Sequence, residues 1–307
     1  MKKEREEPLE LKLLKVLKRR TVLNEQLKRR IMALEKGYEG ERRFDKVFQG
    51  SLGNCLFLND LHFSHDSNYF QIDSLLISAL GIHLYEIKNM EQEYFMEDNK
   101  LFKFPRYEIS NPLNQLSRTE LLFKQMLQKY ELRVDFNPYV VFINPNFTLL
   151  QAPINKRIIL PTQINHHLQS LSKKLPPLPP TKFELAKEIL SLETTERVIR
   201  EMPTYTFEEL RKGVSCLRCG GLNTKREYRM IKCLTCSNVN SLDESILHTI
   251  DEFELLFPFE RLTTSIIVNW CNQEISPSIA LRILKKRYEM QKTKRWSYFV
   301  PIETTKK

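Results

Sequence analysis

Two carboxylates and a lysine lie at positions that favour metal-assisted hydrolysis of a phosphodiester. Glu86 and Lys88 are separated by one residue in a strand-like segment, so both side chains project from the same face. Asp73 lies in the preceding strand-like segment, and antiparallel pairing across a turn near Leu80 brings it close to this pair. Carboxylate oxygens suit Mg2+ or Mn2+, and the lysine can orient the attacking water or stabilise developing negative charge.

This spacing alone is weakly specific, because a Glu-x-Lys sequence on a strand more often marks a solvent-exposed face. The neighbouring residues favour a functional site. Leu84, Tyr85 and Ile87 are apolar, which predicts a central, buried strand. Burying a charged pair in such a strand costs free energy, so its presence there favours a functional role.

Four cysteines form two Cys-x-x-Cys pairs, Cys216 with Cys219 and Cys233 with Cys236. This spacing is typical of a structural zinc site in which four thiolates close the coordination of one ion. A redox-active Cys-x-x-Cys pair is the main alternative, and two matched pairs argue against it. The segment resembles a zinc ribbon, with residues 224–231 as a hairpin arm.

The predicted ribbon is basic, which fits contacts to the phosphates of a nucleic acid. We expect these contacts from Arg218, Lys225 and Arg226.

The C-terminal segment predicts two helices and a strand. A first helix covers 262–271, and Ser276 with Pro277 begins a second one over 278–290. A strand-like run follows at 296–300. The order is similar to a small winged helix-turn-helix, whose second helix enters a groove of the nucleic acid. A helical hairpin with only protein contacts is an equal alternative. The basic residues of the second helix are Arg282, Lys285, Lys286 and Arg287, and we expect nucleic-acid contacts from the first three.

The segments that carry the carboxylates and the lysine belong to a succession of strands and helices typical of an α/β protein. Three strand-like runs precede a helix over about 112–130, and one more run follows it. This order predicts an antiparallel meander that becomes a mixed sheet after a helical crossover. The strand-like runs are 55–58, 69–77, 81–88 and 139–143.

The N-terminal segment predicts an amphipathic helix over residues 8–35, because leucines recur at helical spacing between lysines and arginines. A second helical stretch covers about 38–48. The first helix is either a basic arm for nucleic acid or, as we favour, a packing helix with a solvated face.

The composition fits a globular protein with a polyanionic partner. The chain has 307 residues, a net charge of +10 and a hydrophobic share of 41%. A basic protein without such a partner is the alternative. No apolar run approaches about 18 residues, so we expect no membrane partner. The first residues lack the apolar core of a signal peptide, so we expect a cytoplasmic, reducing setting.

Four short motifs occur in order at residues 37–41, 71–73, 81–89 and 111–115. Each motif is weak alone, and their common order is fairly specific. Together they resemble the motifs of the nuclease-related domain family, called NERD, which is placed in the PD-(D/E)xK nuclease superfamily. The resemblance covers about residues 37–150, which is under half of the chain.

The resemblance implies a restriction-endonuclease-like mixed-sheet core flanked by helices. It also implies roles for individual residues. Glu41 is then the acid on the first core helix that helps to bind Mg2+ or Mn2+. Asp73 and Glu86 are the central metal ligands, Lys88 is the catalytic lysine, and Gln115 lines the site.

These patterns together predict an α/β metal-dependent deoxyribonuclease with DNA-binding modules behind it. RNA as the substrate and a homodimer are left open. One rival is a nucleic-acid-binding or regulatory protein that uses the nuclease fold as a scaffold, and another is a protein-interaction module. The expected segments are an N-terminal basic helix (1–36), the nuclease-like domain (37–172), a proline-rich linker and helix (173–205), the zinc ribbon (206–240) and a basic helical module (241–307).

Overall fold

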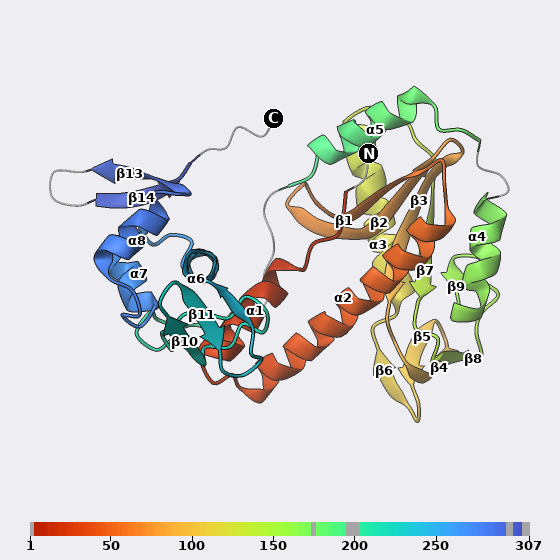
Figure 1. Ribbon diagram of the computed structural model, residues 1–307. Helices are drawn as coiled ribbons and strands as arrows, with labels where there is room; N and C mark the ends of the chain where they lie inside the picture. Colours follow the sequence, from red (N-terminus) through yellow and green to blue (C-terminus); the bar gives the residue numbers. More distant parts are fainter. Residues whose placement is uncertain (1–2, 173–175, 195–202, 293–296, 303–307) are drawn as a thin grey trace. The chain divides into compact units, whose positions relative to one another are not determined.

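The computed structural model (Figure 1) shows an α/β protein with mixed sheets. Within the residues that it describes, no helix is both long enough and apolar enough to cross a membrane. The described residues are 3–172, 176–194, 203–292 and 297–302.

The chain forms two compact units, each built from segments that are distant in the sequence. The first unit comprises Met1–Leu9 and Met32–Arg200. The second unit comprises Glu10–Ile31 and Glu201–Lys307. The residues of the candidate nuclease site therefore belong to the first unit, and the cysteine pairs belong to the second.

The first unit is built on a five-stranded sheet with the order β1-β2-β3-β7-β9 (Figure 1). β1, β2 and β3 are antiparallel neighbours, and β3, β7 and β9 pair in parallel. The connection from β3 to β7 contains α3 (Pro112–Lys129), so the predicted change from a meander to a mixed sheet is confirmed. The strands are β1 (Leu56–His65), β2 (Asn68–Ser78), β3 (Gly81–Lys88), β7 (Phe136–Phe142) and β9 (Ile158–Ile159).

A second sheet of the first unit, with the order β6-β5-β4-β8, was not predicted. Its strands are too short to show a clear alternation of apolar residues. The sequence signal that could have revealed them is the pair Asp98-Asn99, which adopts positive φ in the two-residue turn between β4 and β5. The strands are β4 (Gln92–Glu97), β5 (Lys100–Lys103), β6 (Tyr107–Ile109) and β8 (Phe147–Leu150).

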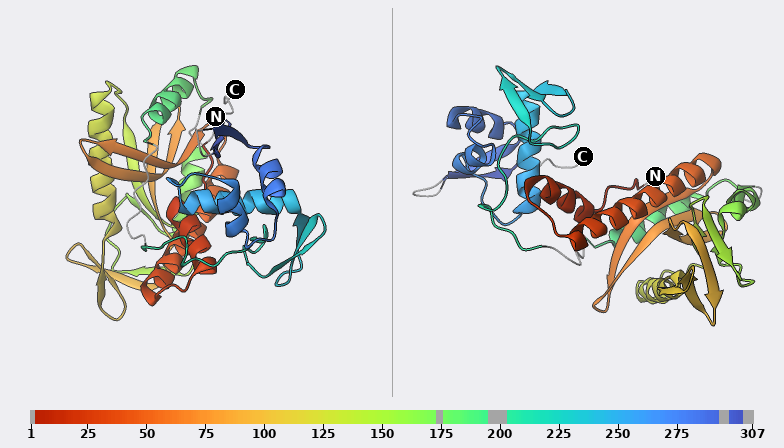
Figure 2. Two further views of the ribbon diagram at one scale, coloured as in Figure 1. Left: turned by 90° about the vertical axis from the view of Figure 1, so that its left-hand side faces the viewer. Right: turned by 90° about the horizontal axis from the view of Figure 1, so that it is seen from below.

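Helices cover both faces of the five-stranded sheet. On one face, α2 (Glu25–Ser51) and α4 (Ile164–Ser172) share an apolar core with Tyr85 and other inward residues. A short 3₁₀ turn, Pro161–Gln163, precedes α4. On the other face, α3 and α5 (Pro180–Ser191) bury residues in a separate core. The right-hand view of Figure 2 shows α2 and α3 on opposite sides of the strands.

The predicted single helix over 8–35 is wrong. α1 (Leu9–Arg20) ends first, and α2 begins after Asn24, whose side-chain oxygen accepts a hydrogen bond from the Leu27 N–H at 2.9 Å. Such a cap starts a new helix within the leucine pattern. α2 then runs on without a break through the second predicted helix at 38–48.

Gly40 lies inside α2 and lets this helix approach the end of β3. A Cβ atom at Gly40 would lie 2.3 Å from the Cβ of Asn89, which follows Lys88. The motif glycine is therefore not the start of a helix but a point of close contact. It fixes the position of α2, and with it Glu41, relative to the strand that carries Lys88.

Alanine substitutions at the two glycines of the motif should have opposite effects. Gly40→Ala is expected to lower the free energy of unfolding by about 1–3 kcal/mol, because the added methyl overpacks the contact with Asn89. Gly37→Ala meets no atom within 4 Å, so it should raise that free energy by about 0.5–1 kcal/mol through helix propensity. Urea unfolding measures both values, and equal shifts would contradict the close approach.

In its described residues, the second unit contains α1, a three-stranded sheet, three further helices and a hairpin. Arg20 lies over the ring of the buried Trp270 at 3.9 Å and pairs with Glu252 at 2.6 Å. α1 is therefore a packing helix of this unit, as we favoured. The elements are β10 (Thr224–Glu227), β11 (Met230–Cys233), β12 (Val239–Ser241), α6 (Leu242–Leu256), α7 (Thr264–Trp270), α8 (Pro277–Leu284), β13 (Tyr288–Lys292) and β14 (Ser297–Pro301).

The second C-terminal helix is shorter than the predicted 278–290. α8 begins after the cap Ser276 as expected, but it ends at Leu284. The residues from Tyr288 onward pair with β14, and the Tyr288 hydroxyl donates a hydrogen bond to Glu254 at 2.7 Å. This tertiary pairing outweighs the helical pattern. The predicted strand at 296–300 corresponds to β14, although Trp296 lies outside the described residues.

Candidate active site

Asp73, Glu86 and Lys88 meet where strands β2 and β3 begin to part. Asp73 and Glu86 lie one step beyond the last paired residues of the two strands. The Ile87 N–H donates to Asp73 Oδ2 at 2.7 Å, so the Asp73 side chain replaces a main-chain acceptor there. Lys88 Nζ lies 2.6 Å from Glu86 Oε1. The hairpin thus brings these three predicted site residues together.

Gln115 reaches the same place from α3. Its Oε1 accepts a hydrogen bond from Lys88 Nζ at 3.0 Å. The helix start is fixed by Asn111, whose side chain accepts from the Leu113 N–H, and by Pro112 in the first turn. Asn111–Pro112 is therefore a helix-entry signal that also places Gln115 next to Lys88.

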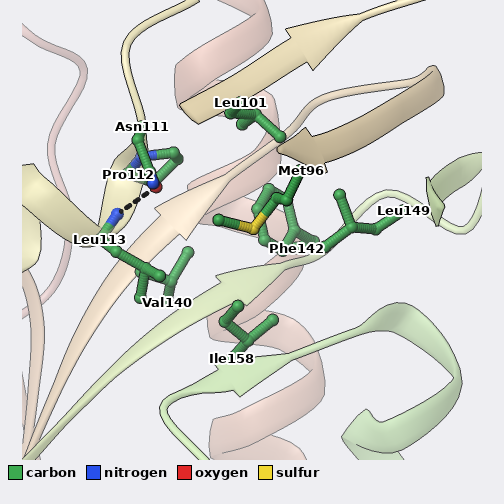
Figure 3. A pocket seen from close by; sticks show the side chains of 9 residues that line it. All are labelled: Met96, Leu101, Asn111, Pro112, Leu113, Val140, Phe142, Leu149 and Ile158. Carbon is green, nitrogen blue, oxygen red and sulfur yellow. Dashed lines mark hydrogen bonds between the residues drawn. The ribbon is translucent and has the colours of Figure 1, made fainter. Parts of the chain in front are cut away.

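Apolar packing holds this helix start in place. Figure 3 shows Val140 of β7 beside Leu113, and Ile158 of β9 with Met96 and Leu101 of the second sheet line the same apolar gap. The unpredicted sheet therefore contributes to the position of Gln115. This apolar gap offers no polar group suited to a metal ion or a phosphate, other than Asn111, which caps α3.

Glu41 approaches from α2, the helix on the opposite face of the sheet. Its Oε2 accepts a hydrogen bond from Arg5 Nη1 at 2.8 Å. Arg5 Nη2 also donates to the main-chain oxygen of Asp73 at 2.8 Å. Glu41 is thus connected to β2 through Arg5.

Arg5 and Asp60 are two charged residues near the predicted site that the sequence analysis missed. Arg5 contacts Glu41, and the charge of Asp60 helps to raise the pKa values of Glu41 and Asp73. Asp60 lies in β1 between the residues paired with Ser74 and Ile72, and it has a positive φ of 52°. Its Oδ1 accepts from His62 Nε2 at 2.9 Å. The polar pair Asn59-Asp60 inside an apolar strand was a usable signal for Asp60, whereas nothing in the sequence points to Arg5.

Burial and mutual repulsion raise the pKa values of the carboxylates. Burial, followed by the charge of Asp73, raises the pKa of Glu41 to about 8 and that of Glu86 to about 7. The pKa of Asp73 is also raised, mainly by burial. Burial lowers the pKa of Lys88, but the charges of Glu86 and Asp73 outweigh it and leave that pKa raised. The site therefore favours binding of a further cation.

The donor set fits a magnesium ion. Mg2+ uses one or two carboxylates and keeps several waters, and Asp73 and Glu86 supply two buried carboxylates. Glu41 does not complete a close group of three ligand atoms with Asp73 and Glu86. Among the described residues, only the four cysteines form a group of three or more ligands whose atoms all lie within 4.8 Å of one another. Glu41, Asp73 and Glu86 therefore do not form a closed three-carboxylate cage.

The raised pKa values give the metal-free protein a defined pH dependence. The folded state holds protons on Glu41 and Glu86 that the unfolded chain releases near the ordinary value of 4.5. The free energy of unfolding should therefore fall as the pH rises from about 4.5 through about 8. Thermal unfolding over this pH range, with and without Mg2+, measures the fall in stability. Added Mg2+ should offset it. A Glu86→Gln variant with an unchanged metal-free profile would refute this origin.

The four cysteines of the second unit have the geometry of a zinc site. The Sγ atoms of Cys216 and Cys236 are 3.7 Å apart, and those of Cys219 and Cys233 are 3.6 Å apart. A tetrahedron with zinc–sulfur bonds of about 2.3 Å has edges of about 3.8 Å. The arrangement therefore fits a zinc ion held by four thiolates. The hairpin arm expected over 224–231 is formed by β10 and β11.

The residues predicted to contact nucleic acid differ in whether they already have partners within the protein. Arg218 and Lys225 are exposed and have no acidic partner in the described part of the chain. Arg226 donates to the main-chain oxygen of Glu274 at 2.7 Å. In the last module, Lys285 is exposed, whereas Asp243 on α6 forms ion pairs with both other predicted residues, Arg282 and Lys286.

Residues 36–143 match the family described as the nuclease-related domain. The matched segment contains Glu41, Asp73, Glu86, Lys88 and Gln115, and it covers less than half of the chain. The resemblance to this family is thus confirmed for this segment. Comparisons with curated proteins and with solved structures gave no match.

Proposed function

We propose that the first unit is a nuclease of the PD-(D/E)xK type that hydrolyses DNA with Mg2+ or Mn2+. One observation carries this proposal. Asp73 and Glu86 lie side by side where β2 and β3 part, and Lys88 contacts Glu86 within the segment that matches the nuclease-related domain. This is the donor set and the cation that metal-assisted phosphodiester hydrolysis requires.

The chain's own residues have distinct parts in this chemistry. Asp73 and Glu86 would hold the ion, with Glu41 assisting from α2. The ion supplies polarisation of the phosphoryl oxygen and acidifies the attacking water. Lys88 Nζ orients this water or stabilises negative charge on the phosphate. Gln115 helps to position Lys88, because its Oε1 accepts a hydrogen bond from the same Nζ that contacts Glu86.

The test is cleavage of linear, nicked, branched and single-stranded DNA, with an RNA oligonucleotide beside them. We expect cleavage with Mg2+ or Mn2+ and none with a chelator. The competing scaffold function predicts binding without cleavage with either ion. Asp73→Ala should abolish cleavage in our account, whereas it leaves the function of a scaffold protein intact.

We also propose that the second unit binds DNA through a zinc ribbon and a winged helix-turn-helix. The four-cysteine cluster supports the ribbon and a structural zinc ion. Two helices, α7 and α8, followed by the β13–β14 hairpin, support the winged module. An isolated antiparallel bridge joins Leu262, just before α7, to Phe299 of β14 and so ties the hairpin to the start of the helices.

The basic face of the ribbon offers a mutational test of DNA binding. Lys225 and Lys232 lie directly opposite each other on β10 and β11, and both are exposed. Like charges in such a pair are destabilising unless an anion lies across them. The double variant Lys225→Gln/Lys232→Gln should lower DNA affinity and reduce the slope of affinity against salt by about 2. Arg282→Gln should change the slope less, because Arg282 is already paired with Asp243. Fluorescence anisotropy measures both, and equal slopes for the double variant and wild type would count against the ribbon.

A further inference from the structure

We propose that Arg5, outside the segment that matches the nuclease-related domain, is a positioning residue of the active site. It holds the Glu41 carboxylate at a fixed place relative to strand β2. This inference rests on the proposed function, because it assigns Glu41 to the metal site. It makes the N-terminal segment of the chain part of that site.

The N-terminal segment is held against the sheet by main-chain pairing. Lys3 forms a parallel bridge to Leu58 of β1. The Lys3 N–H donates to the Phe57 oxygen at 3.1 Å, and the Asn59 N–H donates to the Lys3 oxygen at 3.3 Å. β1 is the edge strand of its sheet, so the segment occupies an otherwise open edge. The position of Arg5, two residues further on, is therefore set by strand pairing.

The Arg5 guanidinium joins α2 to β2. Nη1 donates to Glu41 Oε2 at 2.8 Å, and Nη2 donates to the main-chain oxygen of Asp73 at 2.8 Å. Nε and Nη2 donate to the two oxygens of Asp45, at 2.9 Å and 3.2 Å. Asp45 lies one helical turn after Glu41, so one planar group is fixed by two side chains of α2 and one strand. The Arg5 side chain is only 2% exposed.

This arrangement leaves part of Glu41 available to a cation. Arg5 takes Oε2, while Oε1 accepts no hydrogen bond from any residue that the structure describes. Burial and the bidentate contact to Asp45 argue for a permanent anchor. If the Arg5 guanidinium only occupied the place of the metal ion and left when the ion bound, it would not need the contact with Asp45. Partners that orient a metal ligand in this way are typically worth about 10–100-fold in metal affinity.

The experiment is calorimetric titration of the zinc-loaded full chain with Mn2+. We expect Arg5→Gln to bind Mn2+ about 10–100-fold more weakly than wild type. Arg5→Lys keeps the charge but loses the planar fork, so its affinity should fall between the two. Lys3→Gln is the matched control from the same segment. It removes the ion pair with Glu193 and a hydrogen bond to the main-chain oxygen of Asp60, and it removes no contact to Glu41. Its Mn2+ affinity should stay near the wild-type value. Far-ultraviolet circular dichroism checks the fold of each variant.

Three results would overturn the proposal, and they have different meanings. Unchanged or tighter Mn2+ binding by both Arg5 variants means that Arg5 does not position a metal ligand. An equal loss in Lys3→Gln means that Arg5 acts only by docking the segment. If wild type itself binds no Mn2+ beyond its zinc, the proposed metal-dependent function fails, and the role of Arg5 fails with it. If Arg5→Gln does not fold, the comparison of Arg5→Lys with Lys3→Gln decides.

Discussion

The Glu86→Gln variant should cleave DNA about a thousandfold more slowly than wild type, which corresponds to about 4 kcal/mol of transition-state stabilisation. Two effects combine in this loss. The substitution removes one of the two carboxylates beside the parting strands, and it removes the partner that holds Lys88 Nζ at 2.6 Å. Single-turnover cleavage at saturating Mg2+ measures the rate of the chemical step.

Glu93→Gln is a matched control for this variant. Glu93 is an exposed acid on β4, the next strand along the chain and part of the second sheet, so the same charge is removed from the same unit. Its cleavage rate should equal that of wild type. DNA affinity measured without metal should be similar for both variants, because the proposed DNA-binding groups lie in the second unit. A Glu86→Gln variant that cuts as fast as Glu93→Gln would remove Glu86 from the active site.

Loss of zinc should unfold the second unit. The sheet β10–β12 has strands of only three or four residues and cannot be stable alone. Structural zinc contributes about 10–16 kcal/mol to the folding of isolated zinc-finger peptides at neutral pH. The variant Cys219→Ser/Cys236→Ser should therefore bind no zinc. Its thermal unfolding should also lack the separate transition of the second unit. Elemental analysis and calorimetry measure the two.

Cys55→Ser is the control for the zinc variant. Cys55 lies in the first unit, where burial raises its pKa to about 11, and it belongs to no group of ligands in the described residues. Its substitution should leave the zinc content and the transition of the second unit unchanged. A zinc-free double variant that melts like wild type would show that the cysteines are not a structural site.

Local patterns were sufficient to predict the part of the fold that carries the site. The apolar runs around Asp73 and Glu86 predict the two strands, and Asn111–Pro112 predicts the start of α3. These signals depend on residues close together in the sequence. The same holds for the cysteine pairs, whose spacing is set by the geometry of one ion.

Features that depend on distant contacts could not be predicted in this way. Tyr288 leaves the helical pattern because it pairs with a strand that comes later in the chain. Arg5 acts on Glu41 across a sequence separation of 36 residues, and its place depends on pairing with the edge of β1. The leucine pattern over 8–35 hid the cap at Asn24, because a polar residue on the solvent side of a helix does not disturb the apolar repeat.

The central claim is that Lys88 takes part in metal-dependent cleavage, and the cleavage rate of Lys88→Ala beside wild type tests it most directly. Both proteins are measured at saturating Mg2+ on the DNA that wild type cuts best. We predict that Lys88→Ala still binds Mn2+ and DNA but cuts about a hundredfold or more slowly, because the charge stabilisation at the phosphate is lost. Equal rates for the two proteins, or no cleavage by either, would contradict the account.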